Sequence, residues 1–154
     1  MKIIFLDIDG VLNHHKTRTI TRDGWCFVED YMVQNLALII RNTNAKIVLS
    51  STWRIDWNQE DESRNGLCFE DLRNKFHEYG IDIMDKTGPT RHTRGQEIEE
   101  WLANWDWNKE PIEHFVIIDD MADIAPFQAN FIQTDPSKGL TFFKAQEIIN
   151  FLNI

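Results

Sequence analysis

Short apolar runs alternate along this chain with stretches in which apolar residues recur every three or four positions. The short runs predict buried strands over residues 2–7, 46–50, 81–84, 115–119 and 129–133. The longer stretches predict helices with their apolar positions at Val33, Leu36, Ala37 and Ile40; Leu72, Phe76 and Tyr79, ended by Gly80; Ile98, Trp101, Leu102 and Trp105; and Ala145, Ile148, Ile149 and Leu152. This alternation predicts an α/β fold with three layers, in which a Rossmann-like parallel sheet has helices on both faces.

Two stretches interrupt the alternation. Residues 13–28 are polar and basic, and we expect them to form a flap over the end of the first strand. Residues 53–68 contain a charged run and predict a loop insertion. Neither stretch is long enough for a separate cap domain, and no linker-like segment divides the chain. We therefore expect a single domain over residues 1–154 with an open site.

The first predicted strand ends abruptly in two carboxylates. Asp7 and Asp9 lie on one side of an extended chain because side-chain direction alternates with a period of two, and Gly10 lets the backbone turn away at once. Two acids that face the same way are costly unless a cation lies between them. Mg²⁺ is the expected cation, because it prefers carboxylate oxygen and leaves room for a substrate phosphate.

Two other predicted strands also end in polar residues. Ser50 and Ser51 follow the second strand, and Asp119 and Asp120 follow the fourth. In an open parallel sheet, ligands bind beyond the carboxyl ends of the strands. These residues and the Asp7 pair therefore predict one shared site.

The charge of the chain restricts its partners. A net charge of −9 argues against a protein that coats nucleic acid non-specifically, so we expect no long tract of nucleic acid as a partner. Six of the 16 Lys and Arg nevertheless lie in segments 14–22 and 86–94, which contain no acid and predict a local basic rim. No run of 18 apolar residues predicts a membrane span, and the isolated Cys26 and Cys68 suit a reducing compartment, so we expect a cytoplasmic protein.

The order of these motifs resembles the haloacid dehalogenase (HAD) superfamily of phosphotransferases over residues 2–135. The matching words are DIDGVLN, VLSSTWR, RGQEIEEWL, VIIDD and GLT, and as a set they are most similar to the small HAD domains associated with RNA repair proteins. The resemblance implies an HAD-like fold with a minimal cap or none.

The resemblance also implies a role for each motif. Asp7 would attack phosphorus as the nucleophile, and Asp9 would serve as general acid and base. Ser50 and Ser51 would bind phosphoryl oxygens through a hydroxyl and a backbone N–H, and Arg94 would supply a cation for the phosphate. Mg²⁺ would be held by Asp7, by the Asp9 backbone carbonyl, and by Asp119 or Asp120.

Several assignments keep an alternative. Ser51 is the alternative to Ser50 as the source of the hydroxyl, and Lys86 and Arg91 compete with Arg94 for the role of phosphate-binding cation. Arg54, four residues after Ser50, contacts phosphate or forms a surface ion pair. Asp123 suits a supporting position or a helix cap, and His14 and His15 suit a solvated flap. The tryptophans Trp25, Trp53 and Trp57 are candidates to stack a nucleobase at the entrance.

These residues predict a Mg²⁺-dependent phosphomonoesterase with an aspartyl-phosphate intermediate. An acid at position 9 favours phosphate hydrolysis over the dehalogenase and phosphonatase chemistries of the superfamily. The expected partner is a phosphorylated nucleic-acid end or a phosphorylated small molecule. A nucleotidase or small-metabolite phosphatase is the first alternative, and a non-catalytic interaction domain with an HAD-like fold is the second.

Overall fold

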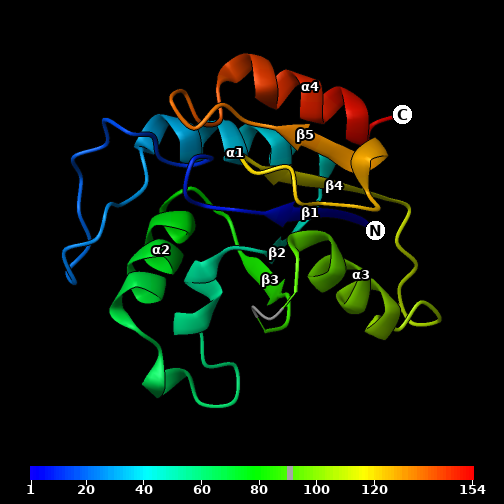
Figure 1. Cartoon of the computed structure of the whole chain (residues 1–154), viewed down its shortest axis with the longest axis horizontal. Coiled ribbons are helices and arrows are strands. Elements are labelled where there is room, and N and C mark those ends of the chain that lie inside the picture. The colour runs from blue at the N-terminus through cyan, green and yellow to red at the C-terminus, as the bar shows by residue number, and fades with distance from the viewer. Residues whose placement is uncertain (90–91) are drawn as a thin grey trace.

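A computed structural model describes residues 1–89 and 92–154 of the chain. The elements of the sheet and its helices are β1 (Lys2–Leu6), α1 (Asp30–Thr43), β2 (Lys46–Leu49), α2 (Leu67–Glu78), β3 (Ile83–Lys86), α3 (Arg94–Asn104), β4 (His114–Asp119), β5 (Phe131–Gln133) and α4 (Phe142–Leu152). The strands form one parallel sheet in the order β3-β2-β1-β4-β5 (Figure 1). The predicted α/β arrangement is confirmed.

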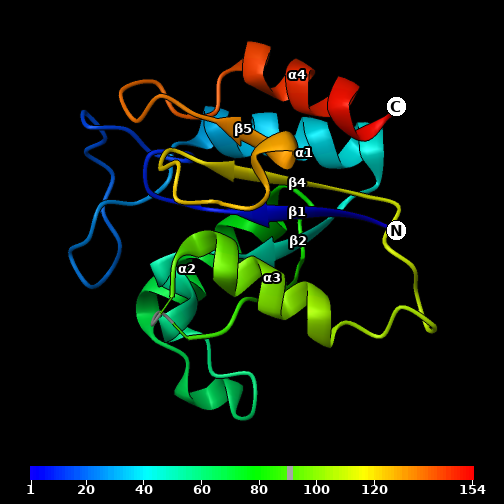
Figure 2. The ribbon, with the colours of Figure 1, turned by 45° about the vertical axis from the view of Figure 1, so that its right-hand side comes forward.

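The helices cover the two faces of the sheet unequally. One apolar cluster joins one face of the sheet to α1, α2 and α4, and a second cluster joins the other face to α3. In Figure 2, α3 lies in front of the strands and α1 lies behind them. The strand order reverses between β1 and β4, which is where an open α/β sheet leaves a crevice for a ligand.

The third strand begins two residues later than its apolar pattern predicts. Gly80, with φ +70°, follows the end of α2. The N–H of Ile81 donates to the Phe76 carbonyl oxygen at 3.0 Å, and the N–H of Gly80 donates to the His77 carbonyl oxygen at 3.1 Å. These two bonds form a Schellman motif, whose apolar residue packs back on the helix. Ile81 is therefore buried as part of the helix end. The prediction that the strand spans residues 81–84 was wrong at both ends, since β3 runs from Ile83 to Lys86.

Two further boundaries differ from the expectation. The last strand starts at Phe131 because Gln128–Asn130 form a short 3₁₀ turn, η3. The predicted loop insertion over residues 53–68 contains two such turns, η1 (Thr52–Asp56) and η2 (Glu62–Arg64), and its end already belongs to α2. Trp57, expected at the entrance, is 8% exposed and stacks on Phe69 with ring centroids 5.0 Å apart, so it is a core residue.

The flap over residues 13–28 leaves the end of β1 and returns to α1. It contains no regular strand, and an isolated antiparallel bridge between Ile20 and Cys26 closes its tip. In Figure 1 this flap is the blue loop at the left, the side toward which the arrows of β1 and β4 point. None of the described helices is both long and apolar enough to cross a membrane.

Candidate active site

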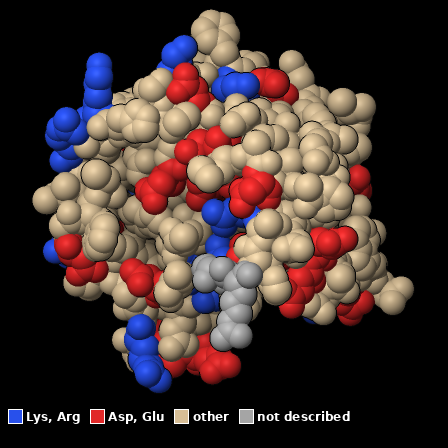
Figure 3. Space-filling model, viewed as in Figure 1, with Lys and Arg blue, Asp and Glu red and all other residues tan. Residues whose placement is uncertain are grey.

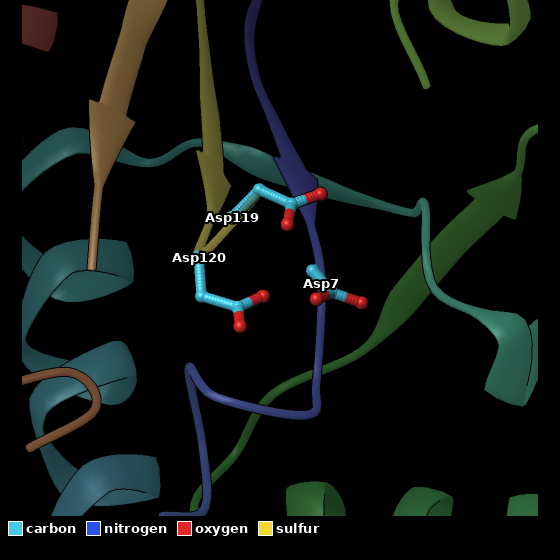
Figure 4. A group of neighbouring side chains, drawn as sticks. All are labelled: Asp7, Asp119 and Asp120. Atoms are coloured by element: carbon cyan, nitrogen blue, oxygen red, sulfur yellow. The ribbon is translucent and has the colours of Figure 1, made fainter. Parts of the chain in front are cut away.

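The carboxyl ends of β1 and β4 bring three aspartates together. Leu6 pairs with Ile118, and the next N–H along β1, that of Asp7, donates to the Ile118 carbonyl oxygen at 3.0 Å. Side chains alternate along strands, which puts Asp7 and Asp119 on the face that α3 covers. Figure 4 shows these two carboxyl groups and that of Asp120 around the ends of the two strands.

The three carboxylates fit a divalent cation. Asp7, Asp119 and Asp120 each offer one oxygen, and all three oxygens lie within 4.8 Å of one another. Octahedral Mg²⁺ holds its oxygen ligands at about 2.1 Å, so its ligands lie at most about 4.2 Å apart, and a slight contraction of the group would suffice. Asp119 already accepts hydrogen bonds from Arg94 and from the N–H of Met121. Among the described residues no N–H or O–H donates to the Asp120 carboxylate, which is therefore the freer of the two candidate ligands.

The carboxylate of Asp9 does not belong to this group. Its carboxylate accepts hydrogen bonds from Nδ2 of Asn13 at 2.9 Å and from Nε1 of Trp53 at 3.1 Å. The turn at Gly10, with φ +79°, is fixed by a bond from its N–H to Oδ1 of Asn13 at 2.9 Å. The expectation that the Asp9 backbone carbonyl faces a metal remains compatible with this geometry, because no donor of the described residues occupies that oxygen. Asn13 was missed by the sequence analysis, because an asparagine in a loop has no distinctive spacing.

Burial makes the charge of this cluster costly. It raises the pKa of Asp7 to about 8, with further repulsion from Asp119. Burial likewise raises the pKa of Asp119 to about 6, and Asp120 adds to that rise. Arg94 lowers the pKa of both groups but does not compensate for burial. The site therefore has an excess of negative charge, which a divalent cation would remove.

Arg94 is the cation that the structure brings to these acids. Its Nε lies 3.1 Å from Oδ2 of Asp119, and its Nη2 lies 3.8 Å from Oδ1 of Asp7. Arg94 begins α3, whose start is stabilised by a capping box between Thr93 and Gln96. At the next position a Cβ on Gly95 would lie 2.0 Å from the carbonyl oxygen of Ala125, so a glycine is needed for α3 to come this close to the end of the sheet.

The other two candidate cations are not in this position. The Lys86 ammonium donates to the backbone carbonyl oxygens of Arg54, at 3.1 Å, and of Trp57. Arg91 lies outside the described residues. The predicted basic rim is also smaller than its sequence implies, because Arg22 forms an ion pair with Asp71 at 2.7 Å.

Arg54 lies beneath the site rather than in it. Its Nη2 lies 2.9 Å from Oε1 of Glu97, and each of these two side chains is 4% exposed. The remaining guanidinium contacts are to the carbonyl oxygens of Gly88 and Ser51, both at 3.0 Å. The expected surface ion pair is therefore a buried one. Glu97 also lies 3.8 Å from Arg94, so it joins the two arginines. The sequence analysis missed Glu97, whose only signal is its position three residues after Arg94.

The two serines after β2 have different surroundings. The Ser50 hydroxyl is buried and has no hydrogen-bond partner among the described residues. The Ser51 hydroxyl hydrogen-bonds Asp7 and thereby lowers the pKa of that carboxyl. The sequence analysis favoured Ser50 as the source of the hydroxyl, whereas the structure brings the Ser51 hydroxyl to Asp7.

A cavity of about 460 Å³ opens above the aspartates. Its wall includes Asp7, Asp9, Arg94 and Asp120, together with residues of the flap. His14 and His15, which we expected in a solvated flap, lie in this wall, as does Thr52, which the sequence analysis did not single out. In the space-filling view, acidic side chains surround a few basic ones in the hollow near the centre of the face (Figure 3).

The raised pKa values predict how stability depends on pH in the absence of divalent cations. A carboxyl with a pKa near 8 in the folded protein and near 3.8 when unfolded binds more protons when folded, so stability falls as pH rises through this range. We expect Asp7→Asn to melt higher than the parent protein in EDTA at pH 8, by roughly 2–4 °C for each kcal/mol gained, and to show little advantage at pH 4.

The control for this prediction is Asp82→Asn, since it makes the same chemical replacement at a side chain that is 90% exposed. Thermal unfolding followed by circular dichroism at both pH values measures the difference. Added Mg²⁺ should raise the melting temperature of the parent protein more than that of Asp7→Asn. An equal pH dependence in the parent and in Asp7→Asn would contradict the prediction.

The comparisons with known proteins agree with this arrangement. Residues 3–145 match the family described as the HAD domain in Swiss Army Knife RNA repair proteins. The matched region contains every site residue named above, from Asp7 to Asp120. The search of curated proteins found no match. Because the family match spans nearly the whole chain, this protein belongs to the family of HAD domains found in Swiss Army Knife RNA repair proteins.

Proposed function

We propose that this protein is a Mg²⁺-dependent phosphomonoesterase that acts through an aspartyl-phosphate intermediate. The observation that carries the proposal is the contrast between Asp7 and Asp9. Asp7 is buried among acids beside Arg94, whereas Asp9 is exposed two residues further on and shares the wall of the same cavity. Membership in an HAD family supports the same chemistry.

The acidic cluster suits a magnesium ion. Asp7, Asp120 and the Asp9 carbonyl would hold it, with Asp119 beside them. When bound, Mg²⁺ would neutralise phosphate charge and keep Asp7 ionised at neutral pH. Asp119 has the additional task of orienting Arg94 through the 3.1 Å contact between them.

In the first half of the reaction, a carboxylate oxygen of Asp7 attacks phosphorus. An O–P bond to Asp7 forms while the bond from phosphorus to the ester oxygen breaks, and Asp9 gives its proton to the departing alcohol oxygen. Arg94 offers a planar fork of donors to the phosphoryl oxygens. The Ser51 hydroxyl, next to Asp7, is the second donor that we assign to them.

In the second half, a water molecule attacks the phosphorus of the intermediate. Asp9, now ionised, takes a proton from that water, and the bond between phosphorus and Asp7 breaks to release inorganic phosphate. The same residue thus serves both halves of the reaction. Its exposure suits this exchange of protons, whereas Asp7 is sheltered from solvent.

The activity can be tested by removing the nucleophile. We expect hydrolysis of p-nitrophenyl phosphate in Mg²⁺ and its loss in EDTA. We also expect a fall of at least about 10³-fold in kcat for Asp7→Asn, because no aspartyl-phosphate can form. Asp82→Asn serves as the surface-charge control. Activity that persists in Asp7→Asn would refute the covalent mechanism, and its absence from the parent protein would favour a non-catalytic interaction domain.

The role of Asp9 predicts a dependence on the leaving group. Nitrophenolate leaves without a proton, whereas the alkoxide of glycerol 2-phosphate needs one. For Asp9→Asn we expect kcat/KM, which reports the formation of the intermediate, to fall by about 10²–10⁴-fold for glycerol 2-phosphate and much less for p-nitrophenyl phosphate. The later attack of water on the intermediate is the same for both substrates, so kcat falls for both. Steady-state kcat/KM values on both substrates measure the difference, and an equal loss of kcat/KM on both would remove Asp9 from the role of acid.

The finer proposal is that the phosphate lies at the end of a nucleic acid. It is supported by the description of the family, which refers to RNA repair proteins, and by the absence of a cap domain over the cavity among the described residues. The exposed Lys16 and Arg18 of the flap suit contact with a single strand end. A nucleotidase would use the same catalytic residues and remains the alternative.

Substrate size distinguishes these two candidates. We expect a 3′-phosphorylated oligonucleotide to be hydrolysed with a higher kcat/KM than the corresponding nucleoside monophosphate, because the flap offers contacts beyond the first nucleotide. The preference should weaken as salt increases, since those contacts are electrostatic. Equal or better hydrolysis of the monophosphate would identify a nucleotidase.

A further inference from the structure

A second cavity, of about 530 Å³, opens beside the first. Asp9, Cys26 and Thr52 belong to the walls of both cavities. A molecule whose phosphate lies over Asp7 can therefore reach the second cavity past Asp9 with the part that departs as the alcohol. Asp9, the acid of the proposed mechanism, lies at the border of the two cavities.

The lining of the second cavity is mainly apolar and aromatic. Trp25 of the flap is 70% exposed, Ile55 of η1 is 67% exposed, and Trp53 lines the same cavity and bonds Asp9. Solvent exposure of large apolar side chains is unfavourable, and a flat apolar group placed against them would relieve it. The tryptophan rings also offer planar faces on which such a group can stack.

Trp53 is held rigidly in this wall. Its ring stacks on Phe27 with centroids 6.5 Å apart and an angle of 25° between the planes. Its Nε1 donates to Asp9 at 3.1 Å, so the ring cannot turn without losing that bond. The stacking surface and the proposed acid are thereby joined at a constant distance.

The charges of the wall restrict the ligand further. Asp9 and Asp56 both line this cavity, and it contains no Lys or Arg among the described residues. A second phosphate there would be repelled, while the amino and ring N–H groups of a nucleobase would find carboxylate acceptors. The wall thus suits a group that is flat, uncharged and rich in hydrogen-bond donors.

We propose that this second cavity binds the base of the nucleoside that leaves, stacked between Trp25 and Trp53, and that it selects nucleoside phosphates over aliphatic ones. The inference rests on the proposed phosphatase function and adds the part of the substrate that the first cavity does not contact. It assigns the base of the leaving nucleoside to the second cavity and names Trp25 as the residue that recognises it.

The test compares substrates with matched alcohols. Adenosine 3′-monophosphate and glycerol 2-phosphate both release a secondary alcohol, and adenosine 5′-monophosphate and glycerol 1-phosphate both release a primary one. We expect the nucleotide of at least one pair to have the higher kcat/KM. Trp25→Ala should lower kcat/KM for that nucleotide by about 10-fold, since a stacked base contributes roughly a factor of this size. It should change kcat/KM for the matched glycerol phosphate by no more than about twofold.

The matched control is Trp107→Ala. Trp107 is 46% exposed but belongs to the segment after α3, at the right in Figure 2, while the flap lies at the left. Ile55→Ala provides a second variant on the other wall and should lower kcat/KM for the same nucleotide. A loss that is equal for nucleotide and glycerol phosphate, or no loss in either variant, would overturn the proposal.

A binding measurement separates this inference from the phosphatase proposal. In Asp7→Asn, which cannot form the intermediate, we expect adenosine to quench tryptophan fluorescence and free ribose to leave it unchanged. Trp25→Ala in the same background should weaken adenosine binding by about 10-fold. If adenosine does not bind to Asp7→Asn, the base site is overturned even when the parent protein hydrolyses glycerol phosphate. If adenosine binds but the parent protein hydrolyses no phosphate ester, only the phosphatase proposal is refuted.

Discussion

The electrostatic cost of burying carboxylates at the ends of β1 and β4 is the constraint on which the site depends. Asp7 and Asp119 are almost inaccessible to water, and Asp120 adds a third charge within a few ångströms. An uncompensated buried charge costs several kcal/mol, so the surrounding chain has to supply cations. Arg94 is the cation that the described residues bring to these acids. The negative charge that Arg94 leaves uncompensated explains why the cluster suits a divalent ion.

The position of Arg94 depends in turn on how closely α3 approaches the sheet. Gly95 permits that approach because a side chain there would collide with Ala125. Glu97, one turn along α3, contacts Arg94 and forms the buried pair with Arg54 that ties the helix to the segment after β2. The end of β4, the start of α3 and the segment after β2 are thus linked through Asp119, Arg94, Glu97 and Arg54.

Much of this arrangement could be predicted from sequence, because it follows from local rules. The run of apolar residues before Asp7 indicates a strand, and a parallel sheet brings the ends of such strands to one edge. The choice of Arg94 over Lys86 also followed from its position before a helix, and the structure places it against Asp7. The burial of Trp57 and of Arg54 could not be predicted, since it depends on residues of α2 and α3 that pack over them.

The sequence by itself determined the succession of strands and helices along the chain, the family, and which acids lie at the strand ends. The reason is that hydrophobic periodicity and sequence motifs are properties of neighbouring residues. Only the tertiary structure decided which groups share an environment. It showed Asp7 buried and Asp9 exposed, although the two are separated by a single residue. The reason is that burial and hydrogen bonding come from other elements: Asp119 and Arg94 surround the first acid, and Trp53 bonds the second.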